Sequence, residues 1–257
     1  MKILAIGDVY GRCGLDMLAR HMSSLKRIYS ADFVIVNGEN ATGAGITPQA
    51  ADELRAAGAD VITLGNHAFG RREIAEYMDS SRFMLRPLNF PPSNPGSGRA
   101  VFDLGRAGSV CVINLIGRAG MDYNADNPFT SIDRLLASED FSNIPVVVDF
   151  HAEATSEKQA MAHHLDGRAA VLFGTHTHVQ TNDARVFKNG LGYITDLGMT
   201  GPIDSVIGVK PELALSRFLG DMTVRFEPAS GPARLDGAVF EIEGRKCLSV
   251  IPVSISD

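Results

Sequence analysis

The run Val171-Leu172-Phe173-Gly174-Thr175-His176-Thr177-His178 places two imidazoles, one residue apart, directly after an apolar segment of strand character. In extended backbone the side chains of residues i and i+2 point in the same direction, so His176 and His178 can converge on one point. Neutral imidazole is the commonest metal ligand in proteins. The segment therefore predicts a buried strand that ends at a metal site.

Four other apolar runs of strand character also end in residues that can bind metal. In open α/β sheets, ligands bind just outside the carboxyl ends of the strands. All five sets of residues are therefore expected to face one crevice. The four runs are residues 2–6 before Asp8, 33–37 before Glu39 and Asn40, 61–64 before Asn66 and His67, and 146–150 before His151.

Length and composition favour a single α/β domain over residues 1–257. The chain is 45% hydrophobic, which is enough to bury a full core, and its strands and helices follow one another without a linker-like break. The formal net charge of −6 argues against a broad basic face for duplex nucleic acid. A small phosphate-bearing molecule is compatible with this charge, because metal cations supply positive charge locally.

The cysteines and the N-terminus indicate a reduced, cytoplasmic setting. Cys13, Cys111 and Cys247 are odd in number and far apart, so neither a disulfide framework nor a thiolate zinc site is expected. The apolar N-terminal run is too short for a signal peptide. No stretch approaches the roughly 20 apolar residues that span a bilayer, so no membrane association is expected.

The first third of the chain predicts parallel strands connected by helices. Residues 15–28 carry apolar side chains at helical spacing. A second helix is expected over residues 48–57, because Thr47 is a capping residue, Pro48 suits the first helical position and Gly58 suits the residue after the end. Strand, helix and strand with short connections favour parallel pairing and right-handed crossovers.

The rest of the chain predicts more antiparallel pairing, so that two mixed β-sheets flanked by helices fit best. One hairpin is expected around residues 105–108, and a second at Asn189-Gly190, a dipeptide typical of type I′ turns. The tail is mostly strand, at residues 223–226, 238–242 and 247–253, with a turn at Glu243-Gly244.

The candidate ligands outnumber what one metal ion needs. Asp8, Glu39, Asn66, His151, His176 and His178 offer two carboxylates, one carboxamide and three imidazoles. A catalytic ion takes about three or four protein ligands, so six suggest two ions that share a bridging carboxylate. Oxygen and nitrogen donors without thiolate favour divalent or mixed-valence iron, manganese or zinc.

Structural roles are the alternative for each residue taken alone. Asp8 and Glu39 lie beside glycines and can form turns, Asn66 can cap a helix, and His151 can be a buried, hydrogen-bonded imidazole. The metal site is favoured because every expected strand end carries a ligand type. His21, His163 and His164 lie on helical segments without a useful spacing and are interpreted as surface or structural residues.

His67 is a candidate general acid. It follows Asn66 on a loop before a helix, and imidazole titrates near neutral pH, so it can protonate a leaving alkoxide without binding metal. The alternative is that His67 caps a helix or only supports the ligands.

The motifs together resemble the calcineurin-like metallophosphoesterases, and more closely their YmdB-like subfamily, over nearly the whole chain. The resemblance implies a four-layer αββα sandwich and a dinuclear metal centre. It also implies phosphodiesterase activity on cyclic nucleotides, with 2′,3′-cyclic substrates favoured and 3′,5′-cyclic ones open. The motifs are Gly7-Asp8-x-x-Gly11, Gly38-Glu39-Asn40-Ala41, Thr63-Leu64-Gly65-Asn66-His67, the ten residues from Asp149 to Lys158, Gly174-Thr175-His176-Thr177-His178, and the seven residues from Thr195 to Gly201.

Three positions depart from the wider superfamily. Tyr10 stands where the first motif usually has a histidine ligand, and Asn40 is the candidate substitute for it. The bridging residue is Glu39 rather than the commoner Asp. Ala68 replaces an acidic residue that often follows Gly-Asn-His, so no carboxylate there can orient His67.

These residues lead to one mechanistic hypothesis with open rivals. One ion is assigned to Asp8, Glu39, Asn40 and His178, and the other to Glu39, Asn66, His151 and His176. A metal-activated hydroxide attacks phosphorus while His67 protonates the leaving oxygen. The rivals are a phosphomonoesterase or nuclease with the same centre, and a regulatory protein that binds metal and nucleotide with weak hydrolysis. Substrate-binding residues stay unassigned, and a homo-oligomer stays open.

Overall fold

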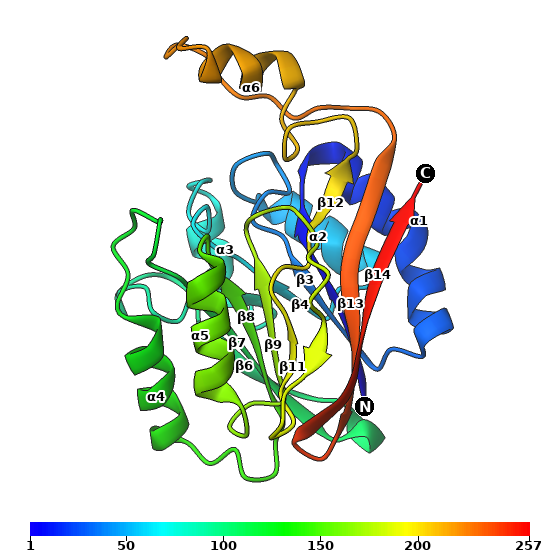
Figure 1. Cartoon of the computed structure of the whole chain (residues 1–257), viewed down its shortest axis with the longest axis vertical. Helices are drawn as coiled ribbons and strands as arrows, with labels where there is room; N and C mark the ends of the chain where they lie inside the picture. The colour runs from blue at the N-terminus through cyan, green and yellow to red at the C-terminus, as the bar shows by residue number, and fades with distance from the viewer.

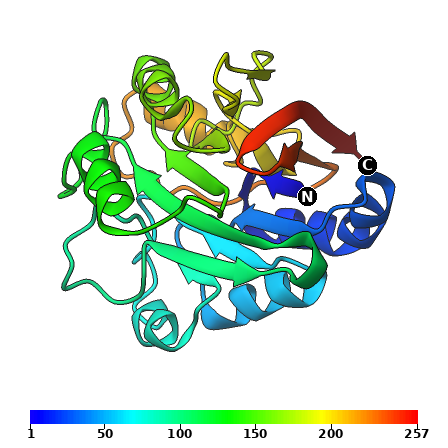
Figure 2. The ribbon, with the colours of Figure 1, turned by 90° about the horizontal axis from the view of Figure 1, so that it is seen from below.

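Two β-sheets pack face to face in the computed structural model, which describes residues 1–257 (Figures 1 and 2). The larger sheet has the order β2-β12-β13-β1-β3-β4-β5, with β14 paired to β13. Its strands are β1 (Lys2–Ile6), β2 (Asp8–Val9), β3 (Phe33–Asn37), β4 (Val61–Thr63), β5 (Met84–Leu85), β12 (Met199–Pro202), β13 (Ala233–Glu243) and β14 (Lys246–Ser256).

The smaller sheet has the order β10-β11-β9-β8-β7-β6. Both sheets are mixed. In the larger sheet β1, β3, β4 and β5 pair in parallel and so do β2 and β12, whereas β13 pairs antiparallel with β1, β12 and β14. In the smaller sheet β7, β8, β9 and β11 pair in parallel, and β6 and β10 pair antiparallel at its two edges. The strands of this sheet are β6 (Arg99–Asp103), β7 (Ser109–Ile116), β8 (Val146–His151), β9 (Val171–Thr175), β10 (Arg185–Val186) and β11 (Gly192–Ile194).

Side-chain alternation along the strands produces the four layers. In β1, Ile3 and Ala5 enter the core between the sheets, whereas Leu4 and Ile6 enter the core beneath the helices of the larger sheet. A third core joins the smaller sheet to its own helices. The expected αββα sandwich is therefore confirmed. The helices are α1 (Gly11–Tyr29), α2 (Pro48–Ala57), α3 (Ile74–Ser80), α4 (Pro128–Ser138), α5 (Thr155–Leu165) and α6 (Pro211–Phe218).

The cap and hairpin predictions hold, but the Asn189-Gly190 turn is not of type I′, because only Gly190 has a positive φ there. Thr47 accepts a hydrogen bond from the amide of Ala50 at the start of α2, and Gly58 ends that helix with φ 113°. Both predicted hairpins form, as β6 with β7 and as β10 with β11. The first helix is longer than predicted, because it begins at Gly11 rather than at residue 15.

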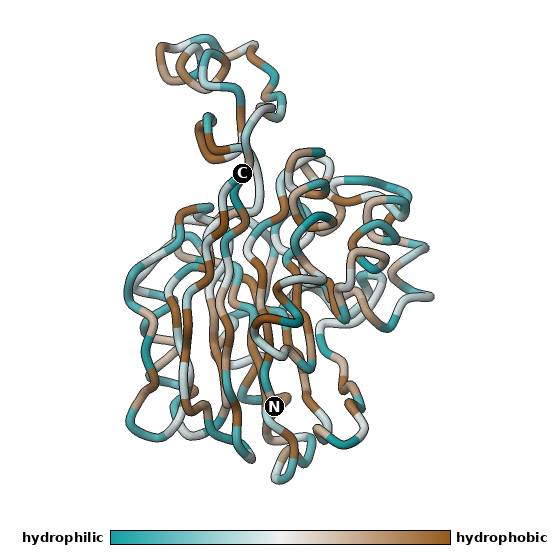
Figure 3. The backbone as a smooth tube through the Cα atoms, turned by 90° about the vertical axis from the view of Figure 1, so that its right-hand side faces the viewer, coloured by the Kyte–Doolittle hydropathy of each residue, from teal (hydrophilic) through white to brown (hydrophobic).

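The predicted strand at residues 223–226 is wrong. These residues lie in an arm that leaves β12, contains α6 and returns to β13, and it rises from the body of the protein (Figures 1 and 3). The alternation in Thr223-Val224-Arg225-Phe226 is that of a strand, but no neighbouring strand lies there to complete a ladder. No helix of the chain combines the length and the apolar character that crossing a bilayer requires.

Candidate metal centre

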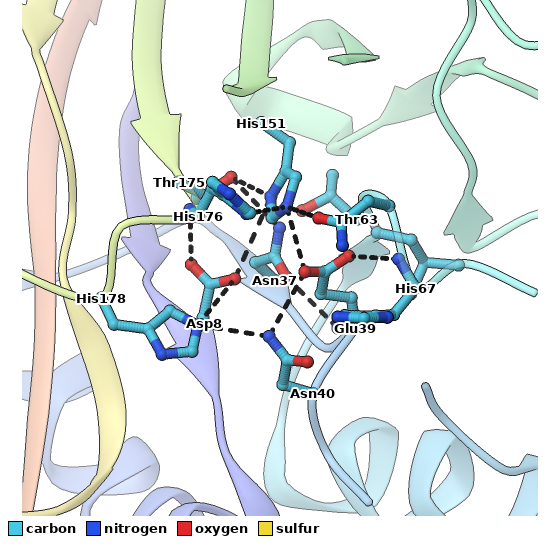
Figure 4. A network of polar contacts seen from close by, with 12 residues as sticks. Asp8, Asn37, Glu39, Asn40, Thr63, His67, His151, Thr175, His176 and His178 are labelled. Carbon is cyan, nitrogen blue, oxygen red and sulfur yellow. Dashed lines mark hydrogen bonds and ion pairs between the residues drawn. The ribbon is translucent and has the colours of Figure 1, made fainter. Parts of the chain in front are cut away.

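The seven candidate ligands lie together at one end of the two sheets, although they come from five separate strand exits. Figure 4 labels six of them, all but Asn66, and shows these six pointing toward one another. Asp8 begins β2, whereas His151 ends β8 and the other five follow β3, β4 and β9. Parallel strands bring these exits to the same edge of each sheet, as the strand-end rule predicts.

One group of donors surrounds the ring of His151. Its Nε2 atom lies 2.9 Å from Asn66 Oδ1, 3.0 Å from His176 Nδ1 and 3.0 Å from Glu39 Oε1. The ligand atoms of Glu39, His151 and His176 all lie within 4.8 Å of one another. The group is therefore a candidate metal-binding group with nitrogen and oxygen donors.

A second group lies beside the first and shares Glu39 with it. Asp8 Oδ1 lies 3.7 Å from His178 Nε2, and the Asn40 amide nitrogen lies 3.2 Å from that nitrogen and 3.3 Å from Glu39 Oε1. Asp8 Oδ1 is buried and has no hydrogen-bond partner in the protein. An unpartnered buried carboxylate oxygen is costly, and a cation at this point would satisfy it.

Asn40, the predicted substitute for the histidine that Tyr10 replaces, lies beside both Glu39 and His178. Half a turn of the Asn40 amide about Cβ–Cγ brings its oxygen to the point where its nitrogen now lies, because the two ends of the amide are alike in shape. The Tyr10 ring is buried and packs edge-on against His178, with 5.6 Å between ring centroids. Tyr10 therefore supports His178 by packing.

Charge in the centre is divided between two carboxylates and His151. Burial opposes ionisation of Asp8 and Glu39, but positive charge on the neighbouring histidines, His178 and His151 for Asp8 and His151 for Glu39, outweighs it and lowers both pKa values. Burial acts to lower the pKa of His151, yet Glu39 raises it to about 9. Burial and the charge of His151 lower the pKa of His176 to about 4. A bound cation would replace the His151 proton.

The ring of His151 is oriented by a buried polar network that sequence reasoning missed. The Thr175 hydroxyl donates to Asp149 over 2.7 Å, so it must accept the 2.9 Å hydrogen bond from His151 Nδ1. The Nε2 lone pair is thereby free to face the centre. Burial raises the pKa of Asp149 to about 6. Asn37 and Thr63 donate to the other Asp149 oxygen, and Figure 4 shows Asn37, Thr63 and Thr175 behind the ligands.

The loop that carries the two histidines is held by a buried ion pair. Lys158 Nζ donates to Asp196 Oδ2 over 2.7 Å and to the Thr175 carbonyl over 3.0 Å. The same Asp196 oxygen accepts a hydrogen bond from the amide of Thr177. His176 and His178 have φ values of 103° and 64°, which are unfavourable for residues with a Cβ. The ion pair, which we call the loop clamp, holds this strained backbone in place.

Glu153 is a further residue that the sequence analysis did not assign. Its Oε2 lies 3.2 Å from His176 Nε2, on the side of the ring opposite the centre. A carboxylate in this position fixes the tautomer that leaves Nδ1 free for a metal. Glu153, Asp149 and Lys158 all belong to the ten-residue motif that begins at Asp149, so the motif was the signal for them.

His67 lies beside the centre with its imidazole free. Its amide donates to Glu39 Oε2 over 3.0 Å, and its carbonyl accepts from Gly70. The ring has no hydrogen-bond partner in the protein, which leaves it available to a bound molecule.

Replacing Gly65 by Ala is expected to displace His151. A Cβ at Gly65 would lie 2.2 Å from Cδ2 and 2.3 Å from Nε2 of the His151 ring. Because the ring must move, metal affinity is expected to fall roughly 100-fold. The measurement is metal content after dialysis against graded chelator. Gly105→Ala is the control for an added methyl group: nothing lies within 4 Å of its Cβ, and the strain expected from φ 60° at Gly105 arises in the β6–β7 turn rather than at the ligands. Equal metal content in both variants would show that the Gly65 contact is unimportant.

An αββα sandwich with carboxylate, carboxamide and imidazole donors at its strand ends is consistent with the metallophosphoesterase class, and relatives named phosphodiesterase or phosphatase show that the chain is a phosphoric diester hydrolase. The chain belongs to the YmdB-like protein family, whose model matches residues 4–253.

Individual relatives agree with this assignment. The chain is 42% identical over 260 residues to a 2′,3′-cyclic-nucleotide 2′-phosphodiesterase of Bacillus subtilis, covering 100% of this chain and 98% of that protein. A solved structure of a hypothetical protein from Thermus thermophilus superimposes with a TM-score of 0.93, 40% identity and complete coverage of both chains. A solved phosphatase from Mycoplasma pneumoniae gives a TM-score of 0.92 and 36% identity, and covers 100% of this chain and 93% of that one.

Proposed function

We propose that the chain hydrolyses cyclic nucleotides at a dinuclear metal centre, with 2′,3′-cyclic substrates preferred. The observation that carries the proposal is the unpartnered, buried Asp8 Oδ1 beside donors that share Glu39. The substrate class is supported by the name of the Bacillus subtilis relative. The whole chain, residues 1–257, acts as one unit, because the ligands come from both sheets.

The ligands divide between the two groups. Glu39 bridges them, because its Oε1 contacts both Asn40 and His151. When bound, divalent or mixed-valence iron, manganese or zinc ions supply positive charge to the phosphodiester oxygens and make hydroxide available near neutral pH. One group is Asp8, Glu39, Asn40 and His178, and the other is Glu39, Asn66, His151 and His176.

His67 protonates the leaving oxygen in this proposal. Two observations support this role: the His67 amide is fixed to Glu39, and the ring has no partner in the protein that would hold it away from a bound phosphate. Imidazole carries a transferable proton near neutral pH. For a 2′,3′-cyclic nucleotide, protonation releases a ribose hydroxyl and leaves a phosphomonoester.

His67→Ala is expected to keep its bound metal and to lose turnover by roughly 10²–10⁴-fold. The measurements are metal content and kcat with 2′,3′-cyclic and 3′,5′-cyclic nucleotides and a phosphomonoester. His21→Ala, on α1 and outside the set of candidate ligands, is the matched control and should behave like the parent. Loss of metal from His67→Ala would make His67 a ligand and contradict the general-acid role. Faster hydrolysis of the monoester than of every diester would contradict the proposed activity.

A further inference from the structure

A structured loop between β7 and α4 lies beside the candidate centre. At its beginning, the Glu157 carboxylate accepts hydrogen bonds from the amides of Arg118 and Ala119. At its end, the Asn89 amide donates to the carbonyl of Asp126. The loop is therefore tied to the body on both sides, and the residues between these anchors have a defined position.

Tyr123, on this loop, reaches the ligands through its hydroxyl group. The Asn66 amide nitrogen donates to the Tyr123 hydroxyl over 3.0 Å, while Asn66 Oδ1 faces His151. Tyr123 is 41% exposed, so its ring is not packed into the core. An aromatic side chain with its polar end held and its ring open to solvent offers a surface on which a planar group can stack.

The proposed chemistry places the nucleoside on the side of the centre where Asn66 and Tyr123 lie. In a 2′,3′-cyclic nucleotide the oxygen that leaves phosphorus belongs to the ribose, and His67 must lie near this oxygen to protonate it. His67 is the sequence neighbour of Asn66, which holds Tyr123. The opposite side, beside His178, is bordered by the carbonyl of Ile207, which accepts from His178 Nδ1.

We propose that Tyr123 forms a nucleoside subsite in which the base of the substrate stacks on its ring. The inference rests on the proposed function, because the position of the leaving oxygen decides which side the base occupies. Stacking depends on the flat face of the base rather than on its hydrogen-bonding groups, so purine and pyrimidine nucleotides should both be accepted. The subsite would explain how a centre that recognises only phosphate distinguishes a nucleotide from other diesters.

Two variants separate stacking from support of Asn66. Tyr123→Ala removes both the ring and the hydroxyl, whereas Tyr123→Phe removes only the hydroxyl. If Tyr123 acts by stacking, Tyr123→Phe keeps the preference for nucleotides and Tyr123→Ala loses it. If Tyr123 only orients Asn66, the two variants behave alike with every substrate, and metal content falls in both.

The experiment compares adenosine 2′,3′-cyclic phosphate with glycerol 1,2-cyclic phosphate, which has a five-membered cyclic phosphate but no base. In Tyr123→Ala, kcat/KM for the nucleotide is expected to fall roughly 10- to 100-fold more than kcat/KM for the glycerol ester. Equal losses with the two substrates would overturn the subsite.

A binding measurement keeps this test separate from the test of the proposed function. Adenosine 3′-phosphate and inorganic phosphate are titrated into the metal-loaded parent and into both variants by calorimetry. The parent and Tyr123→Phe should bind the nucleotide more tightly than phosphate, and Tyr123→Ala should not. If the parent hydrolyses neither cyclic ester, the proposed function fails. If Tyr123→Ala keeps the full preference for the nucleotide, the subsite fails.

Discussion

Replacement of Glu39 by Gln is expected to remove at least one metal ion from each chain and to reduce turnover by about 10³-fold or more. Glu39 is fully buried, and it is the residue that both donor groups share, through the contacts of Oε1 with Asn40 and His151. A glutamine has the same length but carries no charge, and one of its two terminal atoms is a donor that cannot bind a cation. The variant therefore keeps the shape of the site and loses the bridge.

Metal content and kcat, measured without added chelator, test this prediction. Glu53→Gln is the matched control, because Glu53 lies at the surface and pairs only with Arg12 and Gln49. Glu153→Gln gives an intermediate case, since its carboxylate touches the outer nitrogen of His176, and a loss of roughly 10- to 100-fold is expected there. Equal rates for the parent and Glu39→Gln would reject the bridging role.

The grouping of the candidate ligands was predictable because it depends on local rules. The period-two alternation of a strand and the common edge of parallel strands are enough to bring Asp8, Glu39 and His151 together. These rules also led to the two mixed sheets. The roles of the residues as metal ligands remain a prediction, which the Glu39→Gln experiment addresses.

The residues around the ligands were not predictable in the same way, because their roles arise from contacts between distant segments. Tyr123 meets Asn66 across 57 positions in the sequence, and nothing near either residue indicates the meeting. Lysine is rarely buried, so Lys158 on a helix is expected at the surface. In the arm, a local pattern instead predicted an element that does not form. Residues 223–226 have the alternation of a strand, but a strand also requires a neighbouring strand, which a local pattern does not supply.

Replacement of Lys158 by Met is expected to destabilise the protein by about 3–5 kcal/mol, because it breaks a buried ion pair and leaves the charge of Asp196 without its partner. Lys158 and Asp196 are both fully buried. The hydrogen bond from Lys158 to the Thr175 carbonyl disappears as well, so the strained backbone at His176 loses one of its supports. The free energy of unfolding of the metal-free protein, measured by denaturant titration, tests the first effect. Metal affinity of the folded protein tests the second.

Lys210→Met is the matched control for this change, because Lys210 also pairs with a carboxylate, that of Glu227, but the two side chains are 40% and 61% exposed. An exposed pair contributes about 0–1 kcal/mol, so Lys210→Met should lower the free energy of unfolding severalfold less than Lys158→Met does. Asp196→Asn combined with Lys158→Met removes the uncompensated charge, and the double variant should be more stable than Lys158→Met alone. If it is more stable but still binds metal weakly, the loop clamp acts on the histidines through the Thr175 and Thr177 contacts rather than through global stability. If metal affinity recovers together with stability, the clamp has no separate role in positioning them.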